Sequence, residues 1–505
     1  MYFKTKILQA LGILSICILI SSCHKLEEFG DTNVNPNGST VVNTGALLTN
    51  VLANLGTLNS SMNGGLYAQY FAESTYPGTS LYADPNFSNA AIYNGQLMDA
   101  QKIINYNTDP ATKEIAAANG DNNNQIQVAK ILKIYMFSYL TDRYGDIPYS
   151  EALGGVTALS PKYDKQEDIY KSMFTELAAI SAALDPGGAP IKGDIAYSGN
   201  IGKWRKLANS LRILFALKLS ERYPGPTEYA AVELNKAISD PGGYIATNAD
   251  NFMLLYPGGN IKNPWFAQGQ TLDNAVSSTF TSILAGLNDT RLGEFSNGAT
   301  GVPYGLSSAA SANTARVFRA PNLTATPPYV GWRSENSPFF FVTAAHVLLA
   351  VAEAYERGWV SGKTTTDAKL LYDAGVTASF EQWGLTVPAG YLSGGPADYN
   401  TGSGVASIGG TSVPGSSATT ATKLERLWLQ QFIAFYPDGS MAWTNWRRTE
   451  FPKLKPTVNA TNSSKQIIRR YTYAPYEYNL NGAQLAIAIA RLGSNSQDAH
   501  VWFDL

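Results

Sequence analysis

Apolar residues recur at the spacing of an amphipathic helix along most of the chain. In the segment 424–435 they occupy positions i, i+3, i+4 and i+7, and Leu424, Leu427 and Trp428 begin one apolar face. The same periodicity predicts further helices over residues 45–58, 125–140, 169–184, 204–219 and 280–287, and a final helix after residue 479. The pattern therefore predicts a mainly α-helical fold.

Two segments have the spacing of tetratricopeptide-like helix pairs. Residues 204–219 follow the first-helix pattern W-x2-L-A-x2-L. A second pair takes its first helix from 348–355 and its second from 368–375, with Gly375 at one of the second-helix positions. A single pair cannot bury its apolar face alone, so we expect several helix pairs to stack on one another.

Two stretches lack this periodicity. Apart from the helix over 280–287, residues 241–337 are rich in Gly, Asn, Pro and aromatic residues, which predicts a loop-rich insertion. Residues 393–421 form a Gly/Ser/Thr/Ala tract, which predicts a mobile surface loop. Between the helices, Asp164 and Glu167 stand at the spacing of a capping box for the helix over 169–184.

The segment 437–452 combines a turn with indoles and guanidinium groups. Pro437-Asp438-Gly439 ends the preceding helix, and two tryptophans, two arginines and a proline follow closely. Arginine stacks readily on aromatic faces, so this segment predicts a rigid corner. We favour a packed structural corner over a binding site here.

Composition narrows the possible chemistry. The net charge is -2 and charged residues make up 15%, so no basic surface indicates nucleic acid. The two cysteines, Cys17 and Cys23, lie at the N-terminal end, which excludes a disulfide framework and a Cys-based zinc site downstream. Three scattered histidines predict no metal site, and we interpret His346, in its apolar run, as a satisfied core histidine. We expect no cofactor and no metal.

The N-terminus has the features of a lipoprotein signal peptide. Lys4 and Lys6 precede the apolar run 7–20, which is too short to span a bilayer. Ile20-Ser21-Ser22-Cys23 resembles a bacterial lipobox. This predicts a signal peptide over 1–22 and acylation of Cys23 as the lipid anchor, with ordinary secretion as the alternative.

Several ordered strings carry a family resemblance. They are the helix, turn and Trp-Arg-Arg run over 424–456, LTDRYGDIPYSEAL at 140–153, LSPKYD at 159–164, NSLR at 209–212, DTNVNPN at 31–37 and the ending over 468–479. Together they resemble the SusD/RagB-like nutrient-binding lipoproteins of Bacteroidetes-type bacteria. The chain departs from that pattern at Glu450, where the family has Gly, and at Met441, where Glu is usual.

The resemblance implies a single SusD-like domain over 23–505. It also implies a lipid-anchored protein on the outer face of the outer membrane, which binds a nutrient, usually a glycan, and delivers it to a SusC-like TonB-dependent transporter. In the family the helical repeats pack on the transporter, and no enzymatic step is needed. A peptide-binding member is the first alternative, because the same fold serves both kinds of ligand.

Aromatic residues in loop-like, Gly/Pro-rich stretches are the candidates for ligand contact, because a ring offers a flat apolar face to a sugar. They are Tyr70, Tyr76, Tyr82, Trp265, Tyr304 and Trp332. The competing interpretation is that these rings fill the core. A surface glycoside hydrolase is a further alternative, since two carboxylates suffice for that chemistry, but no motif marks a pair.

Overall fold

The computed structural model describes residues 42–73, 75–84, 87–270, 273–296, 301–307, 334–402, 407–408, 411–412 and 422–505. Met1–Asn43 and Thr44–Leu505 are two separate compact units, and all elements below belong to the second. The predicted signal peptide, the anchor Cys23 and the candidate Trp332 lie outside the described residues. In the part of the chain that is described, no helix is both long and apolar enough to cross a membrane.

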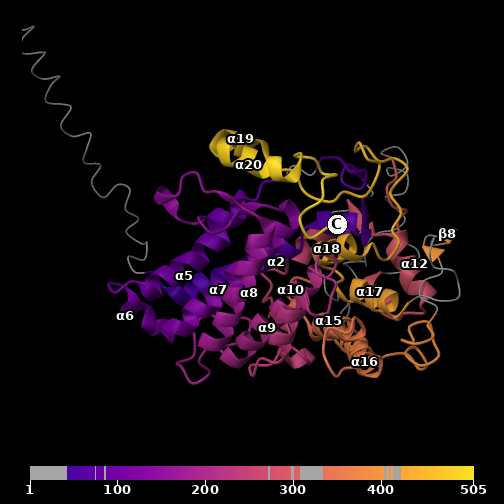
Figure 1. Ribbon diagram of the computed structural model, residues 1–505, viewed down its shortest axis with the longest axis horizontal. Helices are drawn as coiled ribbons and strands as arrows, with labels where there is room; N and C mark the ends of the chain where they lie inside the picture. The colour runs from indigo at the N-terminus through magenta and orange to yellow at the C-terminus, as the bar shows by residue number, and fades with distance from the viewer. Residues whose placement is uncertain are drawn as a thin grey trace, which may run out of the picture. The chain divides into compact units, whose positions relative to one another are not determined.

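Helices make up most of the second unit, which confirms the predicted fold class (Figure 1). The first half contains α2 (Thr44–Asn59), α3 (Met62–Tyr67), α4 (Ala90–Ile92), α5 (Met98–Thr108), α6 (Lys113–Ala116), α7 (Asn122–Tyr144), α8 (Gln166–Ala183), α9 (Ile201–Lys218) and α10 (Tyr229–Ile238). The second half contains α11 (Pro264–Gln270), α12 (Ser278–Gly286), α13 (Leu292–Phe295), α15 (Ala344–Glu356), α16 (Thr365–Glu381), α17 (Lys423–Ala434), α18 (Gly439–Thr449), α19 (Pro475–Leu480) and α20 (Gly482–Leu492).

The strands of the described residues are short and pair only two by two. The antiparallel pairs are β1 (Phe71–Glu73) with β5 (Asn274–Val276), β2 (Ile147–Pro148) with β3 (Tyr163–Asp164), β4 (Phe252–Leu255) with β6 (Pro338–Val342), and β7 (Ser407–Ile408) with β8 (Thr411–Ser412). Each pair therefore ties loops together rather than forming a layer of its own.

Both predicted helix pairs are present, as α9 with α10 and α15 with α16. Neighbouring helices extend the array, because α8 packs on α7 and α9, and α15 also packs on α9. Gly375 allows a close approach within the second pair: a Cβ there would lie 2.8 Å from Cγ and 3.2 Å from the backbone N of Leu349. The small residue is thus needed where α16 crosses α15.

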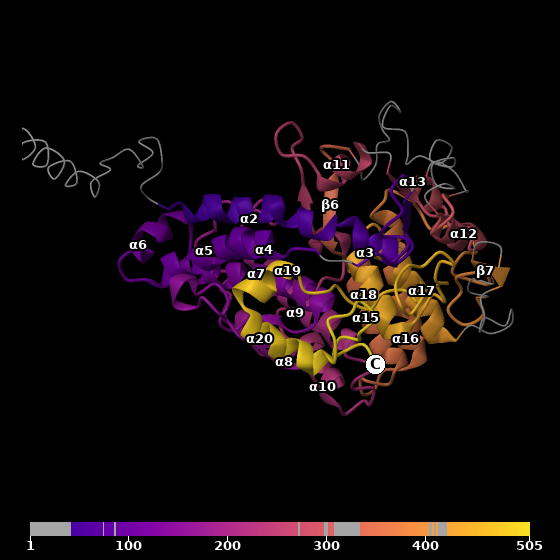
Figure 2. The ribbon, with the colours of Figure 1, turned by 90° about the horizontal axis from the view of Figure 1, so that it is seen from above.

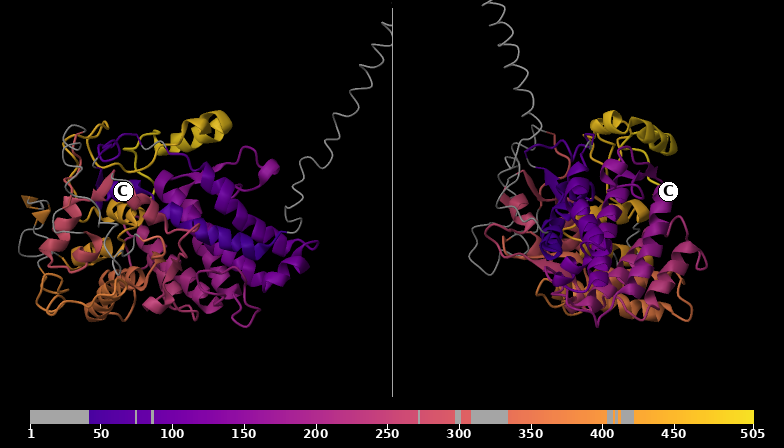
Figure 3. Two further views of the ribbon diagram at one scale, coloured as in Figure 1. Left: turned by 180° about the vertical axis from the view of Figure 1, so that it is seen from behind. Right: turned by 90° about the vertical axis from the view of Figure 1, so that its left-hand side faces the viewer.

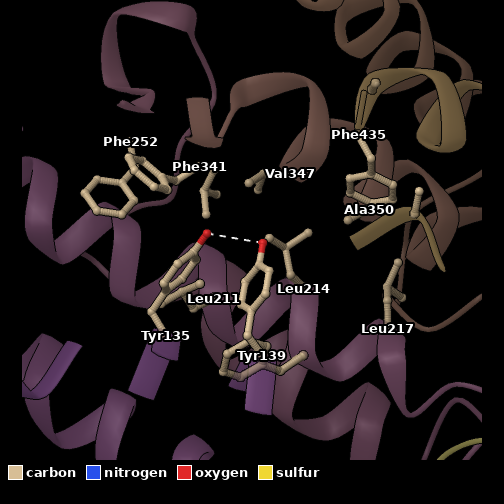
Figure 4. Packing of buried hydrophobic residues seen from close by; sticks show 14 of the residues in the cluster. Tyr135, Tyr139, Leu211, Leu214, Leu217, Phe252, Phe341, Val347, Ala350 and Phe435 are labelled. Atoms are coloured by element: carbon tan, nitrogen blue, oxygen red, sulfur yellow. Dashed lines mark hydrogen bonds between the residues drawn. The ribbon is translucent and has the colours of Figure 1, made fainter. Parts of the chain in front are cut away.

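Segments that are distant in sequence lie side by side. Figures 2 and 3 show the C-terminal helices α19 and α20, in yellow, on the side of the purple first half, where α20 contacts β3. The Arg491 guanidinium of α20 donates to the carboxylate of Asp146 and to the carbonyl of Tyr163, 2.5 and 2.7 Å away. α18 likewise packs against α3. One apolar core runs through these contacts, from Leu48 to Phe503, and Figure 4 shows a part of it around Tyr135 and Tyr139.

The segment after α17 is the packed corner that the sequence predicts. The guanidinium carbon of Arg447 lies 3.9 Å from the ring centroid of Trp443, and both side chains are buried. Its N–H groups donate to the carbonyls of Asp142 and Arg469, both at 2.7 Å. The residues after the turn form the helix α18, which was not predicted from the sequence and which Asp438 caps.

Two expectations need correction and one is confirmed. The helix α8 begins at Gln166, and no capping box forms, because the Asp164 carboxylate accepts instead from the backbone N–H of Ser150 at 2.7 Å. Residues 241–337 contain β4, α11, β5, α12 and α13, and so are more regular than expected. The predicted helix over 280–287 is present as α12.

Residues 393–402, at the start of the 393–421 tract, are held by several hydrogen bonds. Asp398 accepts from the backbone N–H groups of Gly394, Asn400 and Thr401, at 2.9, 2.8 and 2.8 Å. The buried Arg426 donates to the carbonyl of Gly402 at 2.7 Å. Residues 393–402 are thus anchored by hydrogen bonds, while the mobility of the tract stays a prediction, and most of the remainder lies outside the described residues.

Candidate functional site

Distant segments converge where β1 pairs with β5. Phe71 stands opposite Val276 in this pair, and the backbone N–H of Ser277 donates to the carbonyl of Tyr70 at 2.9 Å. The N–H of Val302 then donates to the carbonyl of Val276, also at 2.9 Å. These backbone hydrogen bonds hold the start of β1, the end of β5 and Val302 together. The loop that follows β1 and the loop over residues 301–307 therefore start from one place.

A further segment, 455–461, fastens these loops. The Thr457 hydroxyl and the Asn459 amide donate to the carbonyl of Gly305, at 2.8 and 2.9 Å. The backbone N–H of Thr461 donates to the carbonyl of Leu81 at 2.7 Å. We call residues 75–84, 301–307 and 455–461 the loop platform. Gly305 has a φ of +69°, and a Cβ there would lie 2.2 Å from Oγ1 of Thr457, so glycine is required.

The structure places three of the candidate rings within the core, and one of them, Tyr82, belongs to a platform loop. Tyr70 and Tyr82 are 0% exposed and Trp265 is 3% exposed. Tyr70 packs at 4.7 Å from the ring centroids of both Phe280 and Phe432. A ring that is closed off on both faces cannot stack on a ligand, so the expected ligand contact does not hold for these three residues. They support the loops instead.

Tyr82 is the most constrained of them. Its backbone φ is +61°, which is uncommon for a bulky residue. Its hydroxyl accepts from the backbone N–H of Thr457 at 3.4 Å, and its carbonyl accepts from the Gln497 amide at 2.8 Å. Burial raises the pKa of Tyr82 to about 12, so it stays protonated at neutral pH.

The remaining candidates differ in position. Tyr304 is half-buried and adjoins Tyr82. Tyr76 is 72% exposed on the loop after β1, so its ring is available to a ligand. Trp332 lies outside the described residues. Ligand contact by Tyr76, Tyr304 and Trp332 stays a prediction.

The sequence-based candidates did not include exposed residues of the third loop. Val458 is 98% exposed, and Asn459 and Thr461 beside it are exposed as well. The sequence feature that indicates this exposed loop is the run of turn-forming polar residues after Pro456. The platform thus offers an aromatic ring, an apolar contact and neutral hydrogen-bonding groups.

A titratable group of β1, Glu73, holds one of the platform loops. Burial raises the pKa of Glu73, whose carboxylate accepts from the backbone N–H of Ser80 at 2.7 Å. Within the described ranges, no three His, Cys, Asp or Glu side chains lie together as metal ligands would.

Comparison with known proteins places the chain in a family. A model named SusD-like, described as starch-binding associating with outer membrane, matches residues 36–474. No curated protein matches the chain. Among solved structures, a chitin-binding SusD homologue from Flavobacterium johnsoniae is 25% identical, with a TM-score of 0.74 over 92% of this chain and 98% of that one.

Further structures agree on the fold. A SusD homologue from Bacteroides uniformis is 26% identical, with a TM-score of 0.73 over 92% of this chain and 99% of that one. One from Bacteroides fragilis, 23% identical, has a TM-score of 0.72 over 92% of this chain and 99% of that one, and it supports the fold alone. The chain belongs to the SusD-like family.

Proposed function

We propose that this protein captures a neutral glycan on the loop platform and passes it to a partner transporter. The observation that carries the proposal is the exposed ring of Tyr76 on loops that are fastened to one another by hydrogen bonds. An exposed aromatic ring on loops that also carry hydroxyl and amide groups matches the mixed faces of a sugar. The names of the family and of the Flavobacterium relative, which refer to starch and chitin, support the same ligand class.

Binding alone is the proposed activity. Capture needs stacking and hydrogen bonds, and the buried side chains around the platform are occupied in holding its loops. A peptide ligand remains the second candidate, because exposed amide and hydroxyl groups such as Asn459 also bind peptide backbones. A surface glycoside hydrolase is the third, and release of reducing sugar from a bound glycan would establish it.

The first test is a binding screen on residues 24–505, which lack the lipid anchor. Starch and chitin oligosaccharides and a peptide pool are the probes, and the binding of the best probe is then measured by calorimetry. We expect Tyr76→Ala to weaken glycan binding at least about tenfold, which corresponds to about 1.4 kcal/mol. Tyr478→Ala is the matched control, because Tyr478 is 51% exposed but lies on α19. Equal affinity in both variants would contradict the assignment of the site.

We further propose anchoring through Cys23 and a SusC-like TonB-dependent transporter as the partner in the outer membrane. The family's description as associating with the outer membrane supports this location. In cells, Cys23→Ser is expected to move the protein from the membrane fraction to the soluble fraction. Co-purification of the wild-type protein with a large β-barrel protein of the outer membrane tests the partner, and its absence under mild detergent would argue against this assembly.

A further inference from the structure

A polar cleft lies next to the loop platform and shares one of its segments. The cleft has a volume of about 300 Å³. It is lined by the end of α18, by residues 453–456, by residues 464–469 and by Asp498 and His500. Leu454 and Pro456 line it, while Thr457 and Asn459, directly after them, hold the platform through Gly305. A chain molecule that crosses residues 455–461 would therefore meet both places.

Positive and negative groups balance along the cleft. Lys453 and Arg469 stand against Glu450 and Asp498. Arg469 is engaged, because its Nη2 donates to Glu450 at 2.6 Å and its Nη1 to Asp504 at 3.0 Å. A lining without excess charge gives no reason to select an anion or a cation, and it favours a neutral ligand that offers both donors and acceptors.

Free hydrogen-bonding groups remain at the cleft. Among the described residues, the Lys453 amino group has no ion-pair or hydrogen-bond partner, and the side-chain amide of Gln466 is exposed without one. The Glu450 carboxylate is 58% exposed beyond its pair with Arg469. Ammonium, amide and carboxylate groups together can satisfy adjacent hydroxyl groups, since each hydroxyl donates one hydrogen bond and accepts others.

Stacking is not the means of recognition in this cleft. Trp446 lines it but is only 7% exposed, and the guanidinium carbon of Arg469 lies 5.0 Å from its ring centroid. The indole N–H is also taken, by the carbonyl of Pro452 at 3.2 Å. The indole therefore forms a firm wall, and polar groups carry the selectivity. The volume is at the lower end of the range for small-molecule sites, about 300 to 1,000 Å³.

We propose that this cleft is a second sugar subsite, which takes a terminal unit of the neutral glycan chain whose other units lie on the platform. The proposal rests on the proposed function and deepens it: the ligand is an oligomer held at two places, and not a single sugar. Two linked contacts on one chain molecule raise the affinity for longer chains, because the second contact becomes intramolecular.

Single-cysteine protection tests the proposal, since residues 24–505 contain no cysteine. Three variants report on three places: Gln466→Cys in the cleft, Val458→Cys on the platform and Lys165→Cys at the exposed start of α8. Each is treated with a maleimide in the presence and absence of hexamers of starch or chitin, and the rate of modification is measured. We expect the hexamer to slow modification at least about fivefold in the Gln466→Cys and Val458→Cys variants, and to leave the rate unchanged in the Lys165→Cys variant.

The outcomes separate the two proposals. Protection at position 458 alone would leave the proposed function intact and overturn the second subsite. Protection at neither position by a glycan that binds in calorimetry would overturn both placements. Protection at position 466 by peptides but not by glycans would replace the sugar with a peptide and overturn the proposal as stated.

A substitution gives an independent measure. Lys453→Met keeps the aliphatic stem and removes the ammonium group. We expect this variant to bind the sugar hexamer about fivefold more weakly, while its affinity for the corresponding sugar dimer stays unchanged. Lys165→Met is the control, because Lys165 is exposed and lies outside the cleft. An equal effect of Lys453→Met on dimers and hexamers would assign the residue to the platform and overturn the subsite.

Discussion

Two neighbours fix the protonation state of His346. Its Nδ1 accepts from the backbone N–H of Thr343 at 3.3 Å, and its Nε2 donates to the carbonyl of Ala434 at 3.0 Å. The side chain is buried, and burial lowers its pKa to about 4. If Nδ1 were also protonated, its N–H would face the backbone N–H of Thr343, and two donors cannot form a hydrogen bond with each other. The sequence interpretation of a satisfied core histidine is confirmed, and His346 must stay neutral in the folded protein.

This predicts acid sensitivity with a definite sign. The unfolded chain protonates His346 near pH 6.5, whereas the folded chain does so only near pH 4, so its contribution to stability is present above pH 6.5 and declines as pH falls to 4. The loss amounts to about 3 kcal/mol. We expect His346→Gln to reduce the fall in unfolding free energy between pH 7 and pH 4, measured by denaturant titration. An unchanged slope would show that other groups control the acid limit.

Glu353 is the centre of a buried ionic cluster. Its carboxylate accepts from Arg448 at 2.6 and 2.9 Å, from Arg357 at 2.8 Å and from Gln431 at 2.9 Å. Burial alone would raise its pKa, but the two guanidinium groups hold that pKa well below its usual range. This cluster joins α15, α17 and α18.

Removing that charge leaves the buried Arg448 without its carboxylate partner, while Arg357 keeps only its contact with Glu221, 3.1 Å away. We therefore expect Glu353→Gln to lower the unfolding free energy by about 3 to 5 kcal/mol. Glu167→Gln is the control: its pair with Lys171 is solvent-exposed and is expected to change stability by less than about 0.5 kcal/mol. Similar losses in the two variants, measured by denaturant titration, would contradict the role of the buried cluster.

The candidate ligand residues show what local sequence leaves open at this scale. The Gly/Pro-rich setting correctly marks Tyr76 as exposed, yet the same setting holds the buried Tyr70 and Tyr82. Which way a loop ring faces depends on partners distant in sequence, since the Tyr70 hydroxyl donates to the carbonyl of Phe432 and Tyr82 meets Thr457. No local pattern contains that information.

At the scale of the element, Asp438 begins α18 and also closes a buried network. One carboxylate oxygen accepts from the backbone N–H groups of Ser440 and Met441, both at 3.1 Å, and the other accepts from Asn59 at 2.6 Å and from the Tyr139 hydroxyl. The cap therefore links α18 to α2 and α7. Its loss would leave buried donors without an acceptor.

We expect Asp438→Ala to cost about 3 to 5 kcal/mol of unfolding free energy, because a lost cap and two unsatisfied buried groups add together. Thr364→Ala removes an N-cap of α16 that is solvent-exposed and is expected to cost only about 1 kcal/mol. Thermal or denaturant unfolding of both variants measures the difference. Equal costs would mean that the buried network adds nothing to the cap.

Most of the long helices were predictable and the strands were not, for a physical reason. A helix carries its period within itself, so α7, α9, α12, α15 and α17 follow from apolar spacing alone. The strands are two to five residues long, and their partners are distant in sequence, as in Phe71 opposite Val276. The predicted capping box at Asp164 is wrong for a similar reason. The Asp164 carboxylate accepts a hydrogen bond from Ser150, which lies outside the helix.

At the scale of the whole molecule, one core joins both helix pairs and the platform. The same buried cluster contains Leu234 of α10, Trp359 after α15, and Tyr82 of the platform. No separate core of comparable size exists for either half among the described residues. Thr44–Leu505 should therefore unfold as one cooperative unit, because damage at one end removes support from the other.

Calorimetry on residues 24–505 is expected to show a single transition whose calorimetric and van't Hoff enthalpies agree. Leu234→Ala should shift that whole transition to lower temperature, since opening a cavity at a fully buried leucine costs about 2 to 5 kcal/mol. Val232→Ala, on the same helix but 39% exposed, should shift it much less. If Leu234→Ala instead split the transition and left one part unmoved, the helix pair of α9 and α10 would be an independent unit. The platform would then owe its rigidity to the C-terminal contacts alone.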